Sequence, residues 1–229
     1  MATVHLARQL GAVGFSRIVA VKRLHPQFTS SRDFVTLFLD EARLASRVRH
    51  PNVVSTLDVV ERPPETLMVM EFVEGGTLAQ LAANASKLGV RHPLPVVSAV
   101  VVGMLRGLHA AHEARGDLGE PLGVIHRDIS PHNVIVGTDG VARLLDFGVA
   151  KAAGQLHATL TGVVRGKLAY MAPEHLREHA TKLSDVYAVG VVLWEAVAGR
   201  RLFSGANEAA LMHSVMDRDI PALSAVVPG

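Results

Sequence analysis

The spacing of apolar and polar residues divides the chain into a β-rich first part and a helical second part. Short β-branched runs over 4–7 and 18–22, separated by a glycine-containing segment, predict two antiparallel strands joined by a turn. Two more strands are predicted over 53–60 and 67–72, with a turn at Pro63-Pro64 between them. This part therefore reads as a small, mostly β unit.

A single helix is expected within the β-rich part, over 30–49. Apolar residues recur along it at the three-to-four spacing of one helical face, and Ser30 or Ser31 is placed to cap its start. Pro51 restricts the backbone of the residue before it, so the helix is expected to end there.

Gly75-Gly76 marks a break, after which helical periodicity dominates. Thr77 is expected to cap a short helix through Ala85, and an apolar helix is expected over 185–197. Residues 134–136 and 142–145 lie on either side of a turn at Asp139-Gly140, as in a hairpin. A longer helix lies between, and one stripe of it is formed by Val97, Val100, Val101, Met104, Leu105, Leu108 and His112.

Composition narrows the class of protein. With 229 residues, 49% of them hydrophobic and 19% charged, the chain fits one large domain or two small lobes and is not disordered as a whole. The Lys and Arg residues are scattered, so no nucleic-acid partner is expected. There is no cysteine, and hence neither a disulfide nor a thiolate metal site. No signal peptide or membrane segment is recognised, because the longest apolar run (96–105) falls short of the ~20 residues a span needs, so a cytoplasmic location is expected.

Three short motifs carry candidate chemistry. The segment 126–133 reads His-Arg-Asp-Ile-Ser-Pro-His-Asn, 146–148 reads Asp-Phe-Gly, and 172–174 reads Ala-Pro-Glu. In this order they match the H-R-D-x-x-x-x-N, D-F-G and A-P-E set. Phosphoryl transfer needs a carboxylate near the attacking hydroxyl and oxygen ligands for Mg²⁺. Asp128 suits the first task, and Asn133 and Asp146 suit the second.

From Val4 to about Ile220 the chain resembles the eukaryotic-like, or Hanks-type, protein Ser/Thr kinases of bacteria. The resemblance implies an α+β, two-lobed protein kinase-like fold over residues 1–229. A small β-rich N-lobe with one helix (1–73) is expected, followed by a larger, mostly helical C-lobe (74–229). Against the family pattern, the N-lobe is expected to lack the first strand and most of the Gly-rich loop. The C-lobe is expected to lack the last helices.

The implied activity is transfer of the γ-phosphate of ATP, with Mg²⁺, to Ser/Thr hydroxyls of proteins, including the enzyme itself, in bacterial signalling. Protein substrates and a second copy, for trans-autophosphorylation, are the implied partners. The alternative is a kinase-shaped binding or regulatory module with little turnover, because the Gly-rich loop and the last helices are missing. A small-molecule phosphotransferase is disfavoured by the 172–174 motif, and tyrosine specificity by Ser130-Pro131.

The resemblance also assigns roles to single residues. Lys22, in Val-Ala-Val-Lys, is implied to contact the α- and β-phosphates and to pair with Glu41. Asp40 is the weaker candidate, because Glu41 shares the helical stripe with apolar residues. Asp128 is implied to be the catalytic base, and the ligands of Mg²⁺ are implied to be Asn133 and Asp146.

An adenine pocket is implied by residues 70–73 (Met-Glu-Phe-Val), which resemble the kinase hinge. Backbone groups of Glu71 and Val73 are expected to bind the base, with Met70 behind it as gatekeeper. The apolar residues expected to cover the two faces of the base are Val4 and Ala20 on one side and Ile135 on the other. Plain core packing explains these three residues equally well.

Four residues are implied to be regulatory. Thr159 and Thr161 lie between the second and third motifs and are implied sites of self-phosphorylation. Arg127, with Lys151, is expected to pair with the phosphate. The remaining assignments are structural: His126 packs beneath the loop, Asp185 holds the loop backbone, and Glu174 lacks an arginine partner.

Two substitutions change the charge of the implied site. Ser130 stands where most relatives have a lysine that meets the γ-phosphate, and Gly166-Lys167 replaces the usual Gly-Thr. A positive charge on the transferred group stabilises the transition state. We therefore hypothesise that Lys167 supplies the charge that is lost at Ser130.

Overall fold

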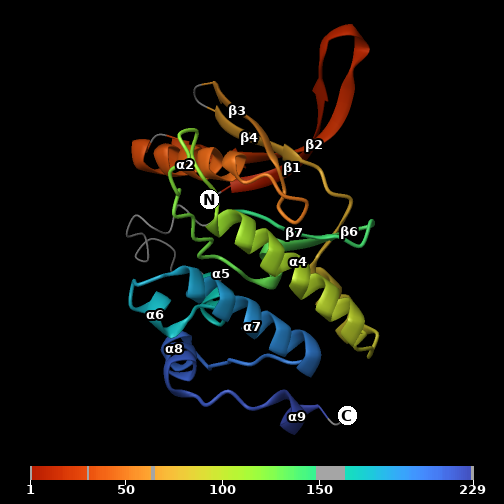
Figure 1. Ribbon diagram of the computed structural model, residues 1–229, viewed down its shortest axis with the longest axis vertical. Coiled ribbons are helices and arrows are strands. Elements are labelled where there is room, and N and C mark those ends of the chain that lie inside the picture. Colours follow the sequence, from red (N-terminus) through yellow and green to blue (C-terminus); the bar gives the residue numbers. More distant parts are fainter. Residues whose placement is uncertain (1, 30, 63–64, 148–162, 228–229) are drawn as a thin grey trace.

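A computed structural model describes residues 2–29, 31–62, 65–147 and 163–227 and arranges them in two unequal parts (Figure 1). The upper part is an antiparallel sheet with one long helix beside it, and the lower part is mostly helical. The predicted α+β class and the two-lobed layout are confirmed.

The sheet of the N-lobe has the strand order β1-β2-β4-β3, with every neighbouring pair antiparallel. Its strands are β1 (Ala2–Leu10), β2 (Ser16–Leu24), β3 (Thr56–Arg62) and β4 (Glu65–Glu71). The first two strands are longer than predicted, because the hairpin continues to a single 3-10 turn, η1 (Ala12–Gly14). Register sets Ala20 opposite Met70 on β4 and Lys22 opposite Val4 on β1.

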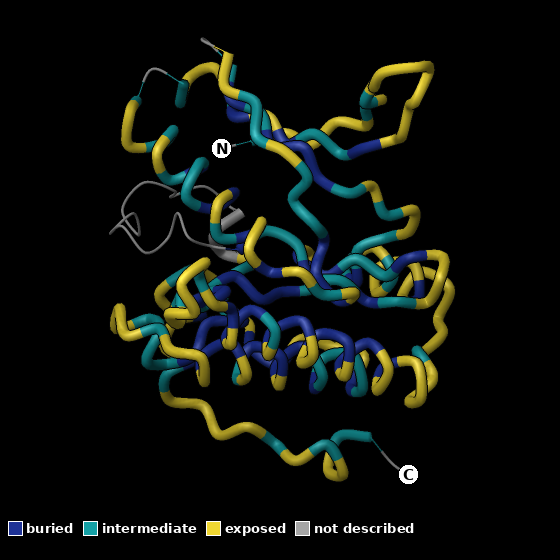
Figure 2. The backbone as a smooth tube through the Cα atoms, turned by 45° about the horizontal axis from the view of Figure 1, so that its top comes forward, coloured by how far each residue is buried: buried dark blue, intermediate teal, exposed yellow. Residues whose placement is uncertain are grey.

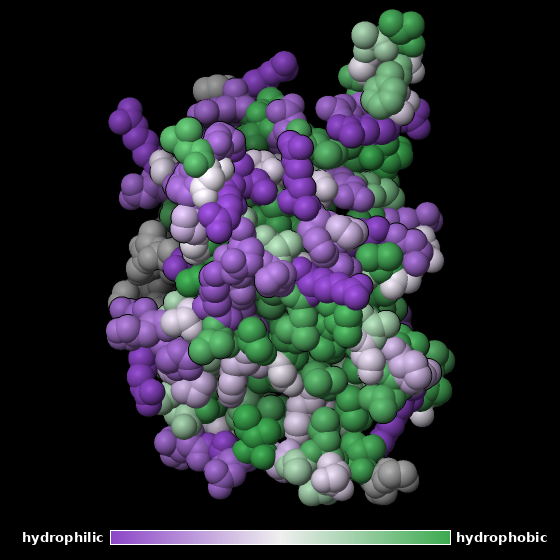
Figure 3. Space-filling model, in the orientation of Figure 1, coloured by the Kyte–Doolittle hydropathy of each residue, from purple (hydrophilic) through white to green (hydrophobic). Residues whose placement is uncertain are grey.

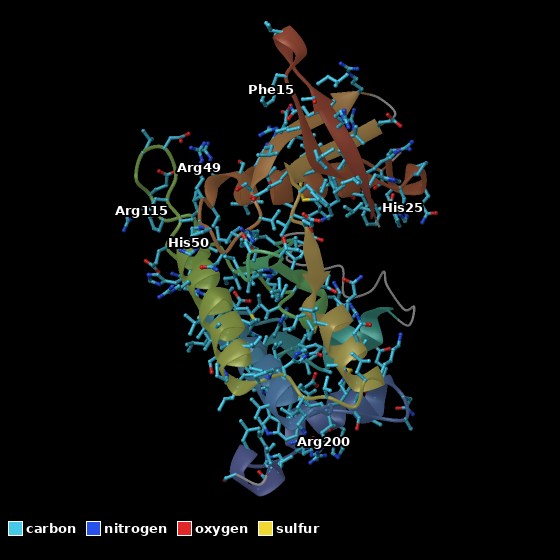
Figure 4. The ribbon with its side chains drawn as sticks, turned by 90° about the vertical axis from the view of Figure 1, so that its right-hand side faces the viewer. Phe15, His25, Arg49, His50, Arg115 and Arg200 are labelled. Atoms are coloured by element: carbon cyan, nitrogen blue, oxygen red, sulfur yellow. The ribbon has the colours of Figure 1, made fainter. Side chains whose placement is uncertain are left out.

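The β1–β2 hairpin projects from the sheet, and its tip is the uppermost point of the molecule (Figure 1). Phe15 lies close to the tip (Figure 4), and hydrophobic residues gather there on the surface (Figure 3). The exposed apolar side chains of the hairpin include Leu6, Leu10, Val13, Phe15 and Ile18. The end of the hairpin therefore contributes little to the core, whereas its base carries Lys22, which is buried.

The predicted N-lobe helix is α2 (Arg32–Arg47), preceded by the short α1 (Pro26–Thr29). Ser31 occupies the position before the helix with extended backbone, although its side chain makes no capping hydrogen bond. The buried face of α2 consists of Phe38, Glu41, Ala42 and Ala45. Three of these residues are apolar, so a carboxylate in the same row must be held by a specific partner.

The predicted strand over 53–60 was wrong at its start, because β3 begins at Thr56. Val53 instead forms an isolated parallel bridge with Leu144 of the C-lobe. The backbone N–H of Val54 donates to the Leu144 carbonyl, at 3.0 Å, and Leu144 N–H donates to the carbonyl of Asn52, at 2.9 Å. This segment therefore ties the two lobes together before it enters the upper sheet.

A second, three-stranded sheet lies at the junction of the lobes in the order β5-β6-β7. It consists of β5 (Gly75–Thr77), β6 (Val134–Gly137) and β7 (Ala142–Leu144). The predicted 134–145 hairpin is confirmed, but the predicted break at Gly75-Gly76 is a strand. A Cβ on Gly75 would lie 2.1 Å from the carbonyl oxygen of Val136, so only glycine allows this pairing.

The core of the C-lobe forms between α4 (Leu94–His112) and α7 (Lys182–Ala198). Buried backbone gathers in the centre of this lobe (Figure 2). The predicted stripe of α4 is buried except at Leu105, which is exposed. By length and composition α4 would also suffice to cross a membrane, but its buried face packs in the C-lobe core. Glycine at 199, with a φ of 68°, ends α7 in the left-handed conformation.

The helix predicted from Thr77 is α3 (Leu78–Lys87). Thr77 and Gln80 form a reciprocal capping box at its start, with Gln80 N–H donating to the Thr77 hydroxyl at 3.2 Å. Further elements without a sequence prediction, besides α1, η1 and β5, are η2 (Pro131–Asn133), α5 (Val163–Leu168), α6 (Pro173–Leu176), α8 (Glu208–Asp217) and α9 (Leu223–Val226). Most are too short for a hydrophobic period to appear.

Candidate active site

The loop that carries Asp128 is held from below by Asp185 of α7. The Asp185 carboxylate accepts hydrogen bonds from the backbone N–H groups of His126 and Arg127, both at 2.8 Å. The ring of His112, on α4, also reaches Asp185 at 2.8 Å. Asp185 and His112 are both buried. The expected role of Asp185 in holding the loop backbone is therefore present in the geometry.

His126 is a structural residue, as predicted. Its ring is fully buried and packs against Phe147, with ring centroids 5.0 Å apart. Burial lowers the pKa of His126, so the ring is neutral. The backbone N–H of Asp128 donates to Nδ1, at 3.3 Å, which requires the proton to be on Nε2, where it is donated to the Leu145 carbonyl at 3.0 Å.

Asp128 lies between an amide and an ammonium group. Nδ2 of Asn133 donates to both the backbone carbonyl of Asp128, at 2.8 Å, and its Oδ2, at 2.9 Å. Nζ of Lys167, from α5, forms an ion pair with the same Oδ2. Because two donors converge on one oxygen, the plane of the Asp128 carboxylate is fixed. Lys167, which we hypothesised to supply the charge lost at Ser130, thus contacts the carboxylate two positions before Ser130.

Lys22 connects the two lobes. Its Nζ lies 2.6 Å from Oε1 of Glu41 and 2.9 Å from Oδ1 of Asp146. The predicted pairing with Glu41 is thus present, while Asp40 pairs with Arg43 on the surface of α2. Burial by itself would lower the pKa of Lys22, but the charges of Asp146 and Glu41 outweigh burial and raise it. Lys22 therefore keeps its charge in the closed interior.

For Glu41, in contrast to Lys22, the effect of burial on the pKa outweighs that of the opposite charge beside it. Burial raises the pKa of Glu41 to about 7, and the nearby charge of Asp146 adds to this, although Lys22 opposes it. Two carboxylates, those of Glu41 and Asp146, therefore contact one buried lysine, and the charge of Asp128 also raises the pKa of Glu41. Such an excess of negative charge favours a cation in the site.

Asn133 and Asp146 are neighbours in space. The carbonyl of Asn133 accepts a hydrogen bond at 2.9 Å from the N–H of Leu145, the residue before Asp146. Asp146 has a φ of 48°, a left-handed conformation that is uncommon outside glycine and often marks functional sites. Both donors of the Asn133 amide group point to Asp128, so its oxygen is turned elsewhere.

This pair suits Mg²⁺, which binds through one or two protein oxygens together with substrate phosphates and water. The Asp146 side chain is also 36% exposed, which leaves it accessible from the cleft. No cluster of three or more His, Cys, Asp or Glu side chains fit for a metal occurs in the described ranges. Among the described residues, protein side chains alone therefore do not complete a metal site.

The apolar residues predicted to surround adenine come from both lobes. Ala20, Val73 and Ile135 are half-buried and pack against the N-lobe core cluster, to which Met70 also belongs. Val4 differs, because its side chain is 60% exposed. The Glu71 N–H is already paired with the Ser55 carbonyl at 2.9 Å. The adenine-binding roles remain predictions, with Val4 the least enclosed of the set.

Thr159, Thr161 and Lys151 lie outside the described residues, so their predicted regulatory roles are not tested. Glu174 was expected to lack a partner, and this expectation was wrong. Its carboxylate is half-buried and accepts a hydrogen bond from the Ser184 hydroxyl at 2.6 Å. Ser184 belongs to the first turn of α7, next to Asp185. Glu174 is thus accommodated by α7 itself.

One polar network near the site was not predicted. The Tyr170 hydroxyl donates to Oε2 of Glu195 at 2.7 Å, and Arg201 contacts both residues. Leu202 N–H adds a bond to Oε1 of Glu195 at 3.1 Å. These residues are separated by up to 31 positions in the chain. The signal in the sequence was a carboxylate, Glu195, close to the end of a strongly apolar stretch of helix.

The residues brought together here share one chemical property. Two ammonium groups are each ion-paired with carboxylates: Lys22 with Glu41 and Asp146, and Lys167 with Asp128, whose carboxylate also accepts from the Asn133 amide. Such groups are chemically suited to a polyanion together with a cation, and a carboxylate such as that of Asp128 is suited to serve as a base for a hydroxyl group.

Comparison with known proteins agrees with this geometry. The model of the protein kinase domain family matches residues 6–226. The chain is 41% identical over 221 residues to the tyrosine-protein kinase MasK of Myxococcus xanthus, covering 96% of this chain and 34% of MasK. It is 36% identical over 220 residues to the serine/threonine-protein kinase PknL of Mycobacterium tuberculosis, covering 95% of this chain and 52% of PknL.

The fold is similar to a crystal structure of a mutant PknI kinase domain from Mycobacterium tuberculosis, with a TM-score of 0.69 and 25% identity. That match covers 100% of this chain and 76% of the PknI chain. The chain therefore spans about a third to a half of the length of the two curated relatives, and most of the solved kinase domain.

Proposed function

This chain belongs to the protein kinase family, and from that premise we propose that it transfers the γ-phosphate of ATP to Ser or Thr hydroxyls of proteins, itself included. The observation that carries the proposal is the double contact of Lys22 with Glu41 and Asp146. This contact joins β2, α2 and the segment after β7 around one charge.

The roles of the residues follow from their placement. Lys22 binds the α- and β-phosphates and is itself positioned by Glu41. Asp128 orients the acceptor hydroxyl and takes its proton as the oxygen attacks the γ-phosphorus. Asn133 keeps the Asp128 carboxylate in plane through its amide group. Ala20, Met70, Val73 and Ile135 form the apolar walls of the adenine site, while backbone groups of Glu71 and Val73 bind the base.

Asn133 and Asp146 are the residues that would hold Mg²⁺. When bound, the metal neutralises charge on the β- and γ-phosphates. Asp146 is already oriented by Lys22, so the same ammonium group positions both the nucleotide and a metal ligand. The excess of carboxylates around Lys22 is the feature of this site that supports a divalent cation.

The residue type that accepts the phosphate, Ser, Thr or Tyr, is inferred from the loop of Asp128 and from the relatives. One relative is named a tyrosine-protein kinase and another a serine/threonine-protein kinase. Ser130-Pro131, in the loop of Asp128, favours Ser and Thr. We further propose that two copies phosphorylate each other at Thr159 or Thr161, and that the domain acts in the cytoplasm, where ATP is present.

The test is the intact mass of residues 1–229 after incubation with Mg-ATP, with Asp128→Asn as a matched control. Added phosphate in the wild type alone would support the proposal. Tandem mass spectrometry of the same sample assigns each phosphate to Ser, Thr or Tyr. No added phosphate, while ATP still raises the melting temperature, would instead favour a nucleotide-binding regulatory module. Phosphate found only on tyrosine would overturn the proposed acceptor.

A further inference from the structure

Lys167 makes a contact that the reaction proposed above does not yet use. Its Nζ pairs with Oδ2 of Asp128, although the two residues are 39 positions apart and lie on different segments. The side chain of Lys167 is 26% exposed and that of Asp128 is 9% exposed. The ammonium group thus lies at the edge of the site, between the buried carboxylate and the open cleft.

Ser130 provides the complementary observation. It follows Asp128 by two positions, and it is 1% exposed. Its hydroxyl oxygen is buried and finds no hydrogen-bond partner within the described part of the chain. A short neutral side chain at this place brings no charge to the reacting centre. The cation beside Asp128 is supplied instead by Lys167, from α5.

The second lysine of the site cannot take this position. Lys22 is bound to Glu41 and Asp146, at 2.6 and 2.9 Å, so its ammonium group is already engaged by two carboxylates other than Asp128. The transferred phosphoryl group must pass next to Asp128, because that carboxylate holds the attacking hydroxyl. Lys167 is therefore the cation placed nearest to the transfer step itself.

We propose that Lys167 is a catalytic residue, whose ammonium group contacts the γ-phosphoryl oxygens during transfer while Asp128 holds the acceptor hydroxyl. This inference rests on the proposed kinase activity. In the step, a bond forms between the hydroxyl oxygen and the γ-phosphorus, and the bond from the γ-phosphorus to the bridging β–γ oxygen breaks. The electron pair leaves with ADP, and the hydroxyl proton goes to Asp128. Lys167 keeps its proton throughout and acts only by its charge.

The same ion pair also keeps Asp128 available. The ammonium group of Lys167 and the amide of Asn133 meet at the same oxygen, Oδ2, and together they fix the orientation of the base. Without nucleotide, Lys167 rests on Asp128. With ATP present, its charge is shared between the carboxylate and the incoming phosphate. The contact is thus a resting position of a catalytic cation and not a block of the base.

The test measures kcat and the KM for ATP in Lys167→Met, Lys167→Arg, Lys167→Thr and the double variant Lys167→Thr/Ser130→Lys. We expect Lys167→Met to lower kcat by roughly 10²-fold, as for the loss of one transition-state donor, with little change in the KM for ATP. Lys167→Arg should retain part of the activity. The double variant, which returns the charge to the Asp128 loop, should recover more activity than Lys167→Thr alone. A purely structural role of Lys167 would not give this recovery.

The control is Lys182→Met, which removes another ion-paired lysine, one bound to Glu113 on the surface. It should leave kcat unchanged. Melting temperatures of all variants separate misfolding from lost catalysis. Undiminished or increased turnover in Lys167→Met would overturn the inference and leave the kinase activity standing. An inactive wild type would overturn the proposed function and this inference with it.

Discussion

Asp185 accepts a hydrogen bond at 2.8 Å from the backbone N–H of Arg127, a residue 58 positions earlier in the chain. Arg127 has a φ of 61°, in the left-handed region that residues other than glycine seldom adopt. Strain of this kind persists only where the surroundings impose it. The buried carboxylate of Asp185 provides that constraint, and as a result the next residue, Asp128, is presented to the cleft.

Asp185→Asn should therefore damage both stability and turnover. The amide keeps the shape of the carboxylate but turns an NH₂ group toward at least one of the three donors from His112, His126 and Arg127. We expect a loss of about 2–4 kcal/mol in the free energy of unfolding, measured by urea titration. Asp217→Asn, at an exposed position in α8, is the control. Equal stability of the two variants would contradict this role of Asp185.

The pH dependence of stability should reveal Glu41. An unfolded glutamate releases its proton near 4.5, whereas burial raises the pKa of Glu41 to about 7 in the folded protein. The folded state therefore binds more protons between these values, and the free energy of unfolding falls as pH rises from 4.5 to 7. The full shift corresponds to roughly 3 kcal/mol. In Glu41→Gln this decline should be absent.

The difference between wild type and Glu41→Gln is the quantity to measure, by urea unfolding at several pH values. His126 acts in the opposite direction, because burial lowers its pKa, and its contribution to stability is lost as pH falls below 6.5. Both proteins share that effect, so it cancels. Glu113→Gln is a matched control, since the pKa of this exposed carboxyl is shifted in the opposite direction, lowered by its contact with Lys182. Parallel curves for wild type and Glu41→Gln would refute the prediction.

Most of the candidate site could be predicted because its residues are tied to short, ordered motifs. Lys22, Glu41, Asp128, Asn133 and Asp146 lie on separate elements, yet the structure brings them together. The choice of Glu41 over Asp40 followed from helical periodicity alone, since the buried face of α2 contains Glu41. Local sequence patterns are sufficient to predict a site residue when the motif around that residue identifies it.

Contacts between distant segments were harder to foresee. The segment 53–55 has strand-like residues, but Val53 bridges to Leu144 in place of continuing β3. The network of Tyr170, Glu195 and Arg201 likewise depends on the packing of α7 against the segment before α6. No spacing rule relates these residues, because their proximity results from tertiary structure.

Close packing of α4 against the lobe junction gives a further prediction. A Cβ on Gly107 would lie 2.5 Å from the carbonyl oxygen of Asn52, which is backbone and cannot swing away. Gly107→Ala should destabilise the protein by about 1–3 kcal/mol. Gly190, in the interior of α7, faces open space, so Gly190→Ala should stabilise it by about 0.5–1 kcal/mol. Melting temperatures that move in the same direction for both variants would contradict this packing.

Phosphorylation of Thr159 or Thr161 should activate the enzyme through Arg127, whose backbone is fixed by Asp185. A phosphate gains bidentate, charge-assisted bonds from a guanidinium group, and one such bond contributes about 1.5–3 kcal/mol. The Thr159→Ala/Thr161→Ala variant should therefore turn over a protein substrate at least about tenfold more slowly than the phosphorylated wild type. Arg127→Lys should lose most of the increase in turnover that phosphorylation gives, because lysine lacks the planar pair of donors. Thr138→Ala, in the exposed turn between β6 and β7, is the control and should keep the turnover of the wild type. Full activity in the Thr159→Ala/Thr161→Ala variant would rule out this mode of activation.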